Sequence, residues 1–452
     1  MTAARTTCRR LCGSRQDMDE FMDNLGDMLE NPSSTVVEKN SRGEDGWMHV
    51  DWKHHFQEWR KSTSALMSSW TESPVERVLI RNRLVYWKRD DQLKLAASIS
   101  GNKARKMIAL QDMQDFPDCV VSYGGPQSNA MVALAAIVHY QSQRNTDTTK
   151  KKRFVYYTKT LPKFLRDKPN GNLFRAQALG MELIELSPHE YANLFGGEWG
   201  GPTTPPPQLE PAPMPNKKSL WIPQGGACAG LALQGTWQLA WEIATFWTQK
   251  GRGRPLTVCI PGGTCSTAAL VHSALQDILH NDNNTAQAIV DTTMDIRVVV
   301  IPCVGDGTYA QRQMMSLLED SNNSSNRLPS ILPPSPIETT RGRTYFRFGE
   351  PHADILATFQ EMKERYGIVL DLLYGAPSWT ILLRHLPLAP KYQATTTTTT
   401  KQPQSLFDPK APLDGREIMY VHSGGVEGIV SQLNRYLYKG LVDVEQVQLP
   451  RR

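Results

Sequence analysis

The stretch over residues 100–129 constrains the fold of this chain more than any other part of its sequence. A Gly-Asn-Lys turn ends at Lys103 and precedes an apolar run with helical spacing. Residues 120–123 then read as an apolar strand, which a Gly-Gly turn separates from Ser128 and a second helical run. Lys103 and Ser128 are 25 residues apart, the length of one helix and one strand. A βαβ unit would therefore bring both side chains to the same edge of a sheet.

An amine and a hydroxyl at the starts of two helices suit a cofactor that carries a carbonyl group. Pyridoxal phosphate binds covalently to a lysine and needs an anion-binding turn for its phosphate. The pattern also has simpler interpretations. Lys103 could lie on a helix surface, and Ser128 with Asn129 could form a plain helix N-cap.

The two motifs taken together carry a resemblance to a known family. Gly-Asn-Lys-x-Arg-Lys and Gly-Gly-x-Gln-Ser-Asn resemble the signature of the 1-aminocyclopropane-1-carboxylate (ACC) deaminase and D-cysteine desulfhydrase family. Those enzymes bind pyridoxal phosphate and share the fold of the tryptophan synthase β subunit. The resemblance covers residues 73–440, apart from three insertions. It implies a two-domain α/β fold with parallel sheets and the cofactor in the cleft between the domains.

Strand and helix patterns alternate along the chain, which also predicts a parallel sheet with helices on both faces. We expect a smaller domain over residues 110–225 and a larger domain from residues 73–109 and 226–440. The expected flanking parts and insertions are as follows: a flexible segment with a short amphipathic helix at 1–46, an N-terminal extension at 47–72, a C-terminal tail at 441–452, and disordered insertions at 198–218, 320–343 and 393–412. The insertions are rich in Pro, Ser, Asn or Thr and are too polar to form a core.

Composition argues against several other classes of protein. The formal charge of +5 is mild for 452 residues, and the basic run 150–153 reads as a solvated connection, so we expect no nucleic-acid partner. No apolar run is long enough for a membrane helix. The seven cysteines lie without CxxC or His spacing, which predicts a reducing, cytoplasmic compartment and no metal site. The first sixteen residues hold arginines and no acid, so mitochondrial import is the alternative.

A second glycine-rich turn follows the apolar strand near residue 260 and flows into a helix. Backbone amides and hydroxyls at such a helix start can hold a phosphate, whereas tight packing is the other interpretation. The expected phosphate-binding residues are Gly262, Gly263, Thr264, Cys265, Ser266 and Thr267. The sequence has no GxGxxG or GxxxxGK[ST] motif, which argues against dinucleotides and nucleoside triphosphates.

The resemblance also assigns roles to single residues. It implies that Lys103 binds the cofactor and moves the substrate's α-proton, with Asn102 and Ser423 as further cofactor contacts. Burial beside a cation, Arg105 or Lys106, would favour the neutral amine. The residues implied to contact the substrate are Gln127, Ser128, Asn129 and Tyr374. Tyr374 would assist proton transfer, with a buried strand tyrosine as the alternative. The charged turn at 88–91 is expected to form structural ion pairs.

Two departures from the family bear on the substrate. Gly375 stands where ACC deaminases have a glutamate and D-cysteine desulfhydrases a threonine, and Ser423 replaces the family's leucine or threonine. The polar residues that follow Ser-Asn in the family are here Ala130, Met131 and Val132. Loss of the glutamate weakens the cofactor as an electron sink, which favours simple β-elimination over ring opening. We therefore expect a lyase acting on a small amino acid, with D-cysteine first, ACC second, and a non-catalytic cofactor-binding protein as the rival. The resemblance implies a homodimer.

Overall fold

The computed structural model describes residues 41–42, 46–63, 72–97, 99–144, 151–196, 201–209, 218–226, 229–280, 290–319, 328–332, 345–386 and 411–443. The amphipathic helix expected within residues 1–46 and most of the three expected insertions lie outside these ranges.

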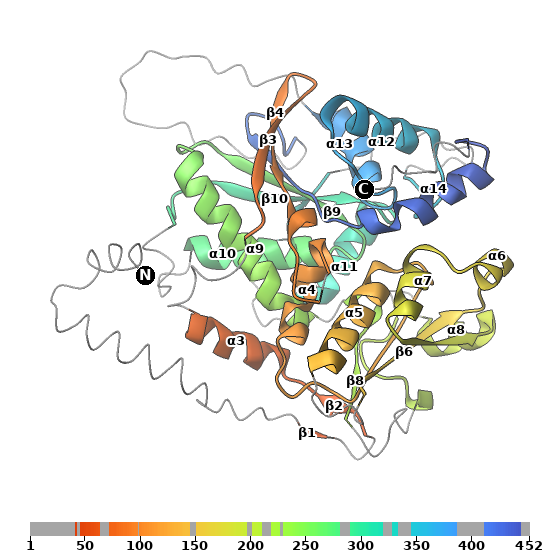
Figure 1. The fold of residues 1–452 in the computed structure, drawn as a ribbon. Helices are drawn as coiled ribbons and strands as arrows, with labels where there is room; N and C mark the ends of the chain where they lie inside the picture. The colour runs from red at the N-terminus through yellow and green to blue at the C-terminus, as the bar shows by residue number, and fades with distance from the viewer. Residues whose placement is uncertain are drawn as a thin grey trace, which may run out of the picture. The chain divides into compact units, whose positions relative to one another are not determined.

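Six strands form the larger sheet, in the order β11-β10-β9-β12-β4-β3 (Figure 1). Neighbouring strands are parallel, except that β3 runs antiparallel to β4. The strands are β3 (Val75–Ile80), β4 (Arg83–Lys88), β9 (Leu256–Gly262), β10 (Ile296–Pro302), β11 (Ser330–Ile331) and β12 (Glu417–Val421).

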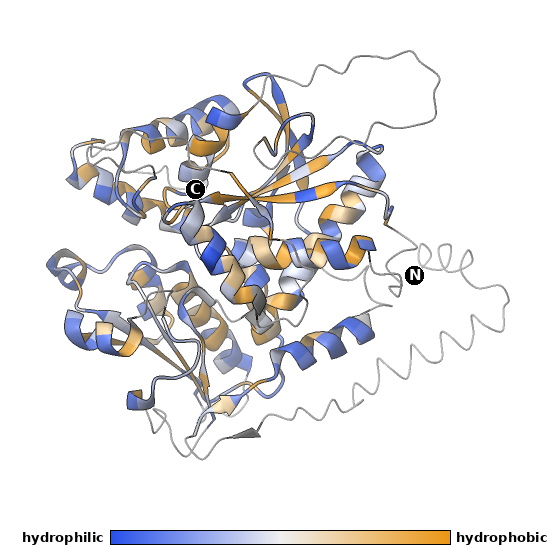
Figure 2. Ribbon diagram, turned by 180° about the vertical axis from the view of Figure 1, so that it is seen from behind, coloured by the Kyte–Doolittle hydropathy of each residue, from blue (hydrophilic) through white to orange (hydrophobic). Residues whose placement is uncertain are grey.

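Helices cover both faces of this sheet, because its central strands bury apolar side chains on each side. Val258 and Ile260 pack with the helices of one face, whereas Cys259 packs with those of the other. This alternation follows from the two-residue period of a strand. The first face carries α9 (Ala229–Lys250), α10 (Ser266–His280) and α11 (Gly307–Glu319), and the second carries α12 (Ala353–Tyr366), α13 (Gly375–His385) and α14 (Ile429–Tyr438). Figure 2 shows the central strands in the orange of apolar residues.

Four parallel strands form the smaller sheet, in the order β7-β6-β5-β8. They are β5 (Cys119–Tyr123), β6 (Arg153–Lys159), β7 (Met181–Leu186) and β8 (Ser219–Trp221). One face packs on α4 (Gly101–Gln111), α5 (Asn129–Arg144) and α7 (Gly171–Ala178), and the other packs on α8 (Pro188–Phe195). Helix α4 also packs against α9 of the larger sheet, so it joins the two halves (Figure 1). The α/β fold with two parallel sheets is thus confirmed.

The remaining elements lie around this framework. Helix α3 (Trp52–Thr63) lies within the segment expected to be an N-terminal extension and packs on α9. A short hairpin joins β1 (Ser41–Arg42) and β2 (Met48–His49), α6 (Lys163–Asp167) follows β6, and η1 (Asp90–Gln92), η2 (Pro207–Leu209), η3 (Gln224–Gly226) and η5 (Val426–Gly428) are single 3₁₀ turns.

Two of the expected disordered insertions are partly ordered, which corrects the sequence-based expectation. Within 198–218, Pro206 is buried, Leu209 packs on the aromatic cluster of the smaller sheet, and Tyr123 donates a hydrogen bond to the Pro202 carbonyl. Within 320–343, strand β11 extends the larger sheet beside β10. In each of these two polar segments, a few residues contact the neighbouring sheet: Leu209 packs on the aromatic cluster, and β11 pairs with β10.

The charged turn after β4 forms a buried ionic network, as expected. Lys88 and Arg105 bind Glu242 of α9, and Arg105 also binds Asp90. Each of these four side chains is only 1% exposed. Ser73 adds a hydrogen bond to Asp90 at 2.5 Å. The network therefore connects the end of β4 with α4 and α9, near the start of α4.

Candidate active site

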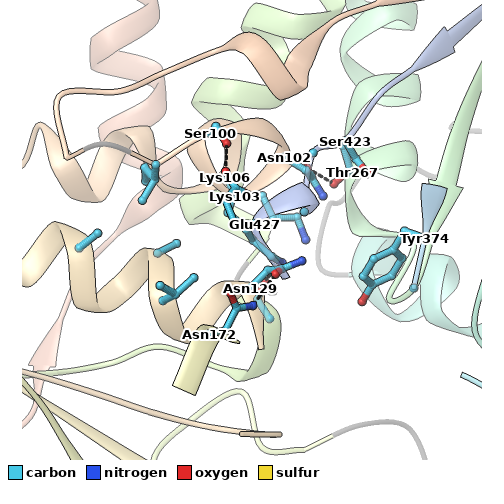
Figure 3. A pocket seen from close by; sticks show the side chains of 18 of the residues that line it. Ser100, Asn102, Lys103, Lys106, Asn129, Asn172, Thr267, Tyr374, Ser423 and Glu427 are labelled. Atoms are coloured by element: carbon cyan, nitrogen blue, oxygen red, sulfur yellow. Dashed lines mark hydrogen bonds between the residues drawn. The ribbon is translucent and has the colours of Figure 1, made fainter. Parts of the chain in front are cut away.

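A cavity of about 410 Å³ is lined by residues from the connections of both sheets (Figure 3). The residues implied by the family resemblance that line it are Asn102, Lys103, Asn129, Gly263, Thr264, Cys265, Ser266, Thr267, Tyr374 and Ser423. Gln127, Ser128 and Gly262 are not among its lining residues. Most of the predicted site thus comes together in one cavity.

Lys103 lies in the first turn of α4. The turn before it brings Gly101 against the backbone of the turn that follows β12. A Cβ at position 101 would lie 2.4 Å from the Ser423 carbonyl oxygen, and Gly101 has a left-handed φ of +66°. Asn102 N donates to that same oxygen at 2.9 Å. The Lys103 Nζ donates to the Gly225 carbonyl at 2.8 Å, and burial lowers the pKa of Lys103 to about 8. This amine is therefore primed to act as a nucleophile or base near neutral pH.

Lys106 is a second cavity lysine, and the sequence analysis did not assign it to the site. It lies one helical turn after Lys103 on the same face of α4, and its buried Nζ donates a hydrogen bond to Ser266 Oγ. Burial, with the charge of Lys103 as a smaller cause, lowers the pKa of Lys106 well below its usual value. Arg105 instead faces the buried network with Asp90 and Glu242. Of the two expected neighbouring cations, Lys106 is thus the one in the cavity.

The loop from Gly262 to Thr267 connects β9 to α10. Cys265 has a left-handed φ of +56°, which turns the loop so that Thr264 and Ser266 approach each other, with 3.1 Å between their hydroxyl oxygens. The first N–H groups of α10 have no carbonyl partner within the helix. Gly262 has a different role: a Cβ there would lie 2.7 Å from Val300. Tight packing therefore explains Gly262, whereas residues 263–267, which we call the cradle, line the cavity and could hold an anion.

The Gly-Gly turn before α5 holds its polar residues in structural hydrogen bonds. Ser128 Oγ accepts from the N–H groups of Ala130 at 3.2 Å and Met131 at 3.4 Å, so it does cap the helix. Gln127 bonds the start of α7, through Asn170 O and Asn172 N. Asn129 Oδ1 accepts from Asn172 Nδ2 at 2.7 Å and lines the cavity.

Tyr374 and Ser423 come from connections next to the larger sheet, Tyr374 directly before α13 and Ser423 in the turn after β12. Tyr374 precedes α13 as its N-cap residue and is not on a strand, so the alternative of a strand tyrosine is wrong. Burial, with the nearby Cys303 as a smaller cause, raises the pKa of Tyr374, so its hydroxyl stays protonated at neutral pH. In Figure 3, Lys103 lies between Asn129 and the group Asn102, Thr267 and Ser423.

Gly375 is buried beside Asp371 and does not line the cavity. A Cβ at position 375 would lie 3.0 Å from Asp371 Oδ2, which accepts the Gly375 N–H at 2.8 Å. Burial raises the pKa of Asp371, while three backbone N–H groups act in the opposite direction. A carboxylate side chain at 375 would therefore meet another carboxyl group.

Comparisons with known proteins agree on the fold. No protein-family model and no curated protein matches the sequence. A solved structure of an ACC deaminase homologue is similar with a TM-score of 0.54 and 18% identity, covering 84% of this chain and 98% of that chain. Diaminopropionate ammonia lyase from Escherichia coli has a TM-score of 0.47 and 12% identity, covering 90% and 95%. The chain thus has the fold of the ACC deaminase homologue.

Metal-binding clusters and membrane-spanning helices are absent from the described ranges. No group of three or more His, Cys, Asp or Glu side chains there could hold a metal ion. Among the described helices, none combines the length and the apolar character that crossing a membrane requires.

Proposed function

We propose that this chain is a pyridoxal-phosphate-dependent lyase that deaminates a small amino acid by α,β-elimination. The observation that carries the proposal is one cavity that contains both a lysine of lowered pKa, Lys103, and an anion cradle with a second, buried lysine. The fold of the ACC deaminase homologue supports it. The proposed catalytic residues are Lys103 and Tyr374, whereas Ser128, the third residue expected in this role, caps α5 outside the cavity lining and would act by positioning that turn.

The residues of the cavity fit pyridoxal phosphate. Lys106 is buried and has no carboxylate partner among the described residues, so a phosphate in the 263–267 cradle would supply its missing counter-charge. Asn102, whose Oδ1 accepts from Thr267 Oγ1 at 2.8 Å, and Ser423 would be further contacts of the cofactor. When bound, the cofactor supplies an electron sink for the α-carbon of the substrate.

The chain's own groups would then position the substrate and move its protons. Asn129 would bind the substrate carboxylate, with Gln127 and Ser128 fixing that turn. Lys103 would take the α-proton and Tyr374 would assist the transfer, because a buried protonated phenol can donate at neutral pH. Hydrogen-bonded Asn172 holds Asn129 in place for this contact.

D-cysteine is the first candidate substrate, and its products would be pyruvate, ammonia and hydrogen sulfide. The preference for β-elimination over opening of a cyclopropane ring rests on the family resemblance, in which Gly375 replaces the glutamate of ACC deaminases, because position 375 itself does not line the cavity. We also propose a homodimer, on the family resemblance alone, and a cytoplasmic location, on the scattered cysteines. Sedimentation of the purified protein tests the dimer.

Visible absorption of the purified protein with pyridoxal phosphate, before and after D-cysteine, tests the proposal. We expect a yellow band that Lys103→Ala abolishes, a change of that band on adding D-cysteine, and release of pyruvate and sulfide. Release of 2-oxobutanoate from ACC instead would assign ACC deamination. A band without turnover of either substrate would leave a cofactor-binding protein, and no band at all would overturn the proposal.

A further inference from the structure

The cavity extends past Asn129 into a part that the proposed chemistry does not use. On α5, the lining residues are Asn129, Val132, Ala133 and Ala136. Their spacing of i, i+3, i+4 and i+7 places them on one face of the helix. The cavity therefore follows α5 away from Lys103 for seven residues, which is about 10 Å at the rise of an α-helix.

Helix α7 forms the opposite wall of this extension. It packs against α5, and the Asn129–Asn172 hydrogen bond joins the first turns of both helices. Arg175 and Leu179, at i+3 and i+7 from Asn172, line the same cavity. Ala97 and Ile99, from the segment before α4, also line it. We call the part bounded by Ala97, Ile99, Val132, Ala133, Ala136 and Leu179 the apolar arm.

The six residues that bound the apolar arm are aliphatic, and Arg175, the charged side chain of α7 that also lines the cavity, is exposed. Glu427 is the single carboxylate among the cavity's described lining residues, and its Oε1 accepts from Ser100 Oγ at 2.7 Å. Phe174 is 58% exposed and lies with Arg175 among the lining residues, which marks where the cavity opens to solvent. Small aliphatic walls of this length suit an alkyl or aryl group rather than the thiol of free cysteine.

We infer that the substrate is a cysteine whose sulfur carries an apolar substituent, and that this substituent occupies the apolar arm. The inference rests on the proposed function and names its substrate class. Lys103 takes the α-proton, the C–H electron pair becomes the Cα–Cβ double bond, and the Cβ–S bond breaks with its pair on sulfur. The thiolate takes a proton and leaves as a thiol, and water converts the remaining enamine to pyruvate and ammonia.

The test is the affinity of the full-length protein, with and without pyridoxal phosphate, for S-methyl-, S-propyl- and S-hexylcysteine, measured by calorimetry. Each methylene buried in the arm should tighten binding about threefold to fourfold. Ala133→Leu and Ala136→Leu fill the arm at different depths, so each should reduce the hexyl-to-methyl affinity ratio. In Ala133→Leu, the affinity should stop increasing at a shorter alkyl chain than in Ala136→Leu. Gln177→Leu, on the exposed side of α7 away from the cavity, is the matched control and should leave the ratio unchanged.

The outcomes separate this inference from the proposed function. Affinity that does not depend on chain length would overturn the inference, even if D-cysteine is turned over. Equal affinity for 1-hexanol and S-hexylcysteine would also overturn it, because the arm would then be a separate apolar site. An affinity that rises with chain length, and that rises less in both arm variants, would support occupation of the apolar arm by the substituent. This holds whether or not D-cysteine yields pyruvate, since binding requires no turnover.

Discussion

Lys106 of α4 donates a hydrogen bond to Ser266 of α10 inside the cavity that also contains Lys103. A buried lysine with a hydroxyl as its partner keeps a positive charge poorly, and burial accordingly lowers its pKa. The pair links the helix that carries the proposed cofactor lysine to the helix that begins the anion cradle.

Lys106→Met should weaken pyridoxal phosphate binding by about 10- to 100-fold, the loss of one charge-assisted hydrogen bond to phosphate. Cofactor titrations followed by absorbance measure this change, and the band should still form at saturating cofactor. The cofactor-free variant should be at least as stable as the parent, because a buried polar group is removed. Lys163→Met, at an exposed lysine, is the control. Unchanged cofactor affinity would mean that Lys106 does not contact the phosphate.

The lowered pKa of Lys103 predicts how fast the cofactor is bound at each pH. Only the neutral amine attacks an aldehyde, so with a pKa of about 8 the reactive fraction rises about tenfold per unit below pH 8 and levels off above it. Stopped-flow absorbance after mixing the cofactor-free protein with pyridoxal phosphate, between pH 6 and 10, gives this profile. A rate that keeps rising to pH 10 would show an ordinary lysine.

The sequence indicated those cavity residues that belong to short motifs, but not those that only the packing of distant segments brings into the cavity. Lys103 and the 263–267 turn each depend on a few adjacent residues, so the sequence motif alone indicated them. The sequence left open whether Arg105 or Lys106 lies beside Lys103, and the structure selects Lys106, because residues two apart on a helix face different directions. Spacing of i+3 could have identified Lys106.

The apolar arm could not be found from the sequence. Ala133 and Ala136 have the pattern of core residues, and both are indeed buried. They line a cavity because Leu179 and the segment before α4 bound the same space, and this depends on how distant segments pack. Ser128 and Gly262 show the reverse case, since their motif suggested a site whereas a helix cap and close packing account for their contacts.

Arg105→Met should destabilise the fold by about 3–5 kcal/mol, because it leaves buried Asp90 and Glu242 with too little positive charge. Urea unfolding at pH 7 measures the loss. Arg153→Met breaks an exposed pair with Glu182 and should cost less than about 1 kcal/mol. Similar losses in the two variants would contradict this view of the network.

The same network predicts a pH dependence. Burial alone would raise the pKa of Asp90, but Arg105 and Lys88 outweigh it and hold that pKa below its usual range. A carboxyl whose pKa is lower in the folded state stabilises the fold above its unfolded pKa, near 4, and loses that contribution as the pH falls. Between pH 5 and 3 the parent should therefore lose more stability than Asp90→Asn, as urea unfolding at each pH would measure.

Gly101→Ala tests the close approach that positions Lys103. The substitution places a Cβ 2.4 Å from the Ser423 carbonyl oxygen and requires an alanine at φ +66°, so the start of α4 must shift. Gly180→Ala imposes a similar left-handed conformation, at φ +90°, with no atom within 4 Å of the new Cβ. That control should lose only about 1–2 kcal/mol of stability and keep its cofactor affinity. Gly101→Ala should lose more stability and also weaken cofactor binding by at least tenfold, since Lys103 and Asn102 move with the turn. Equal behaviour of the two variants would show that backbone strain alone, and not contact with the turn after β12, requires glycine at position 101.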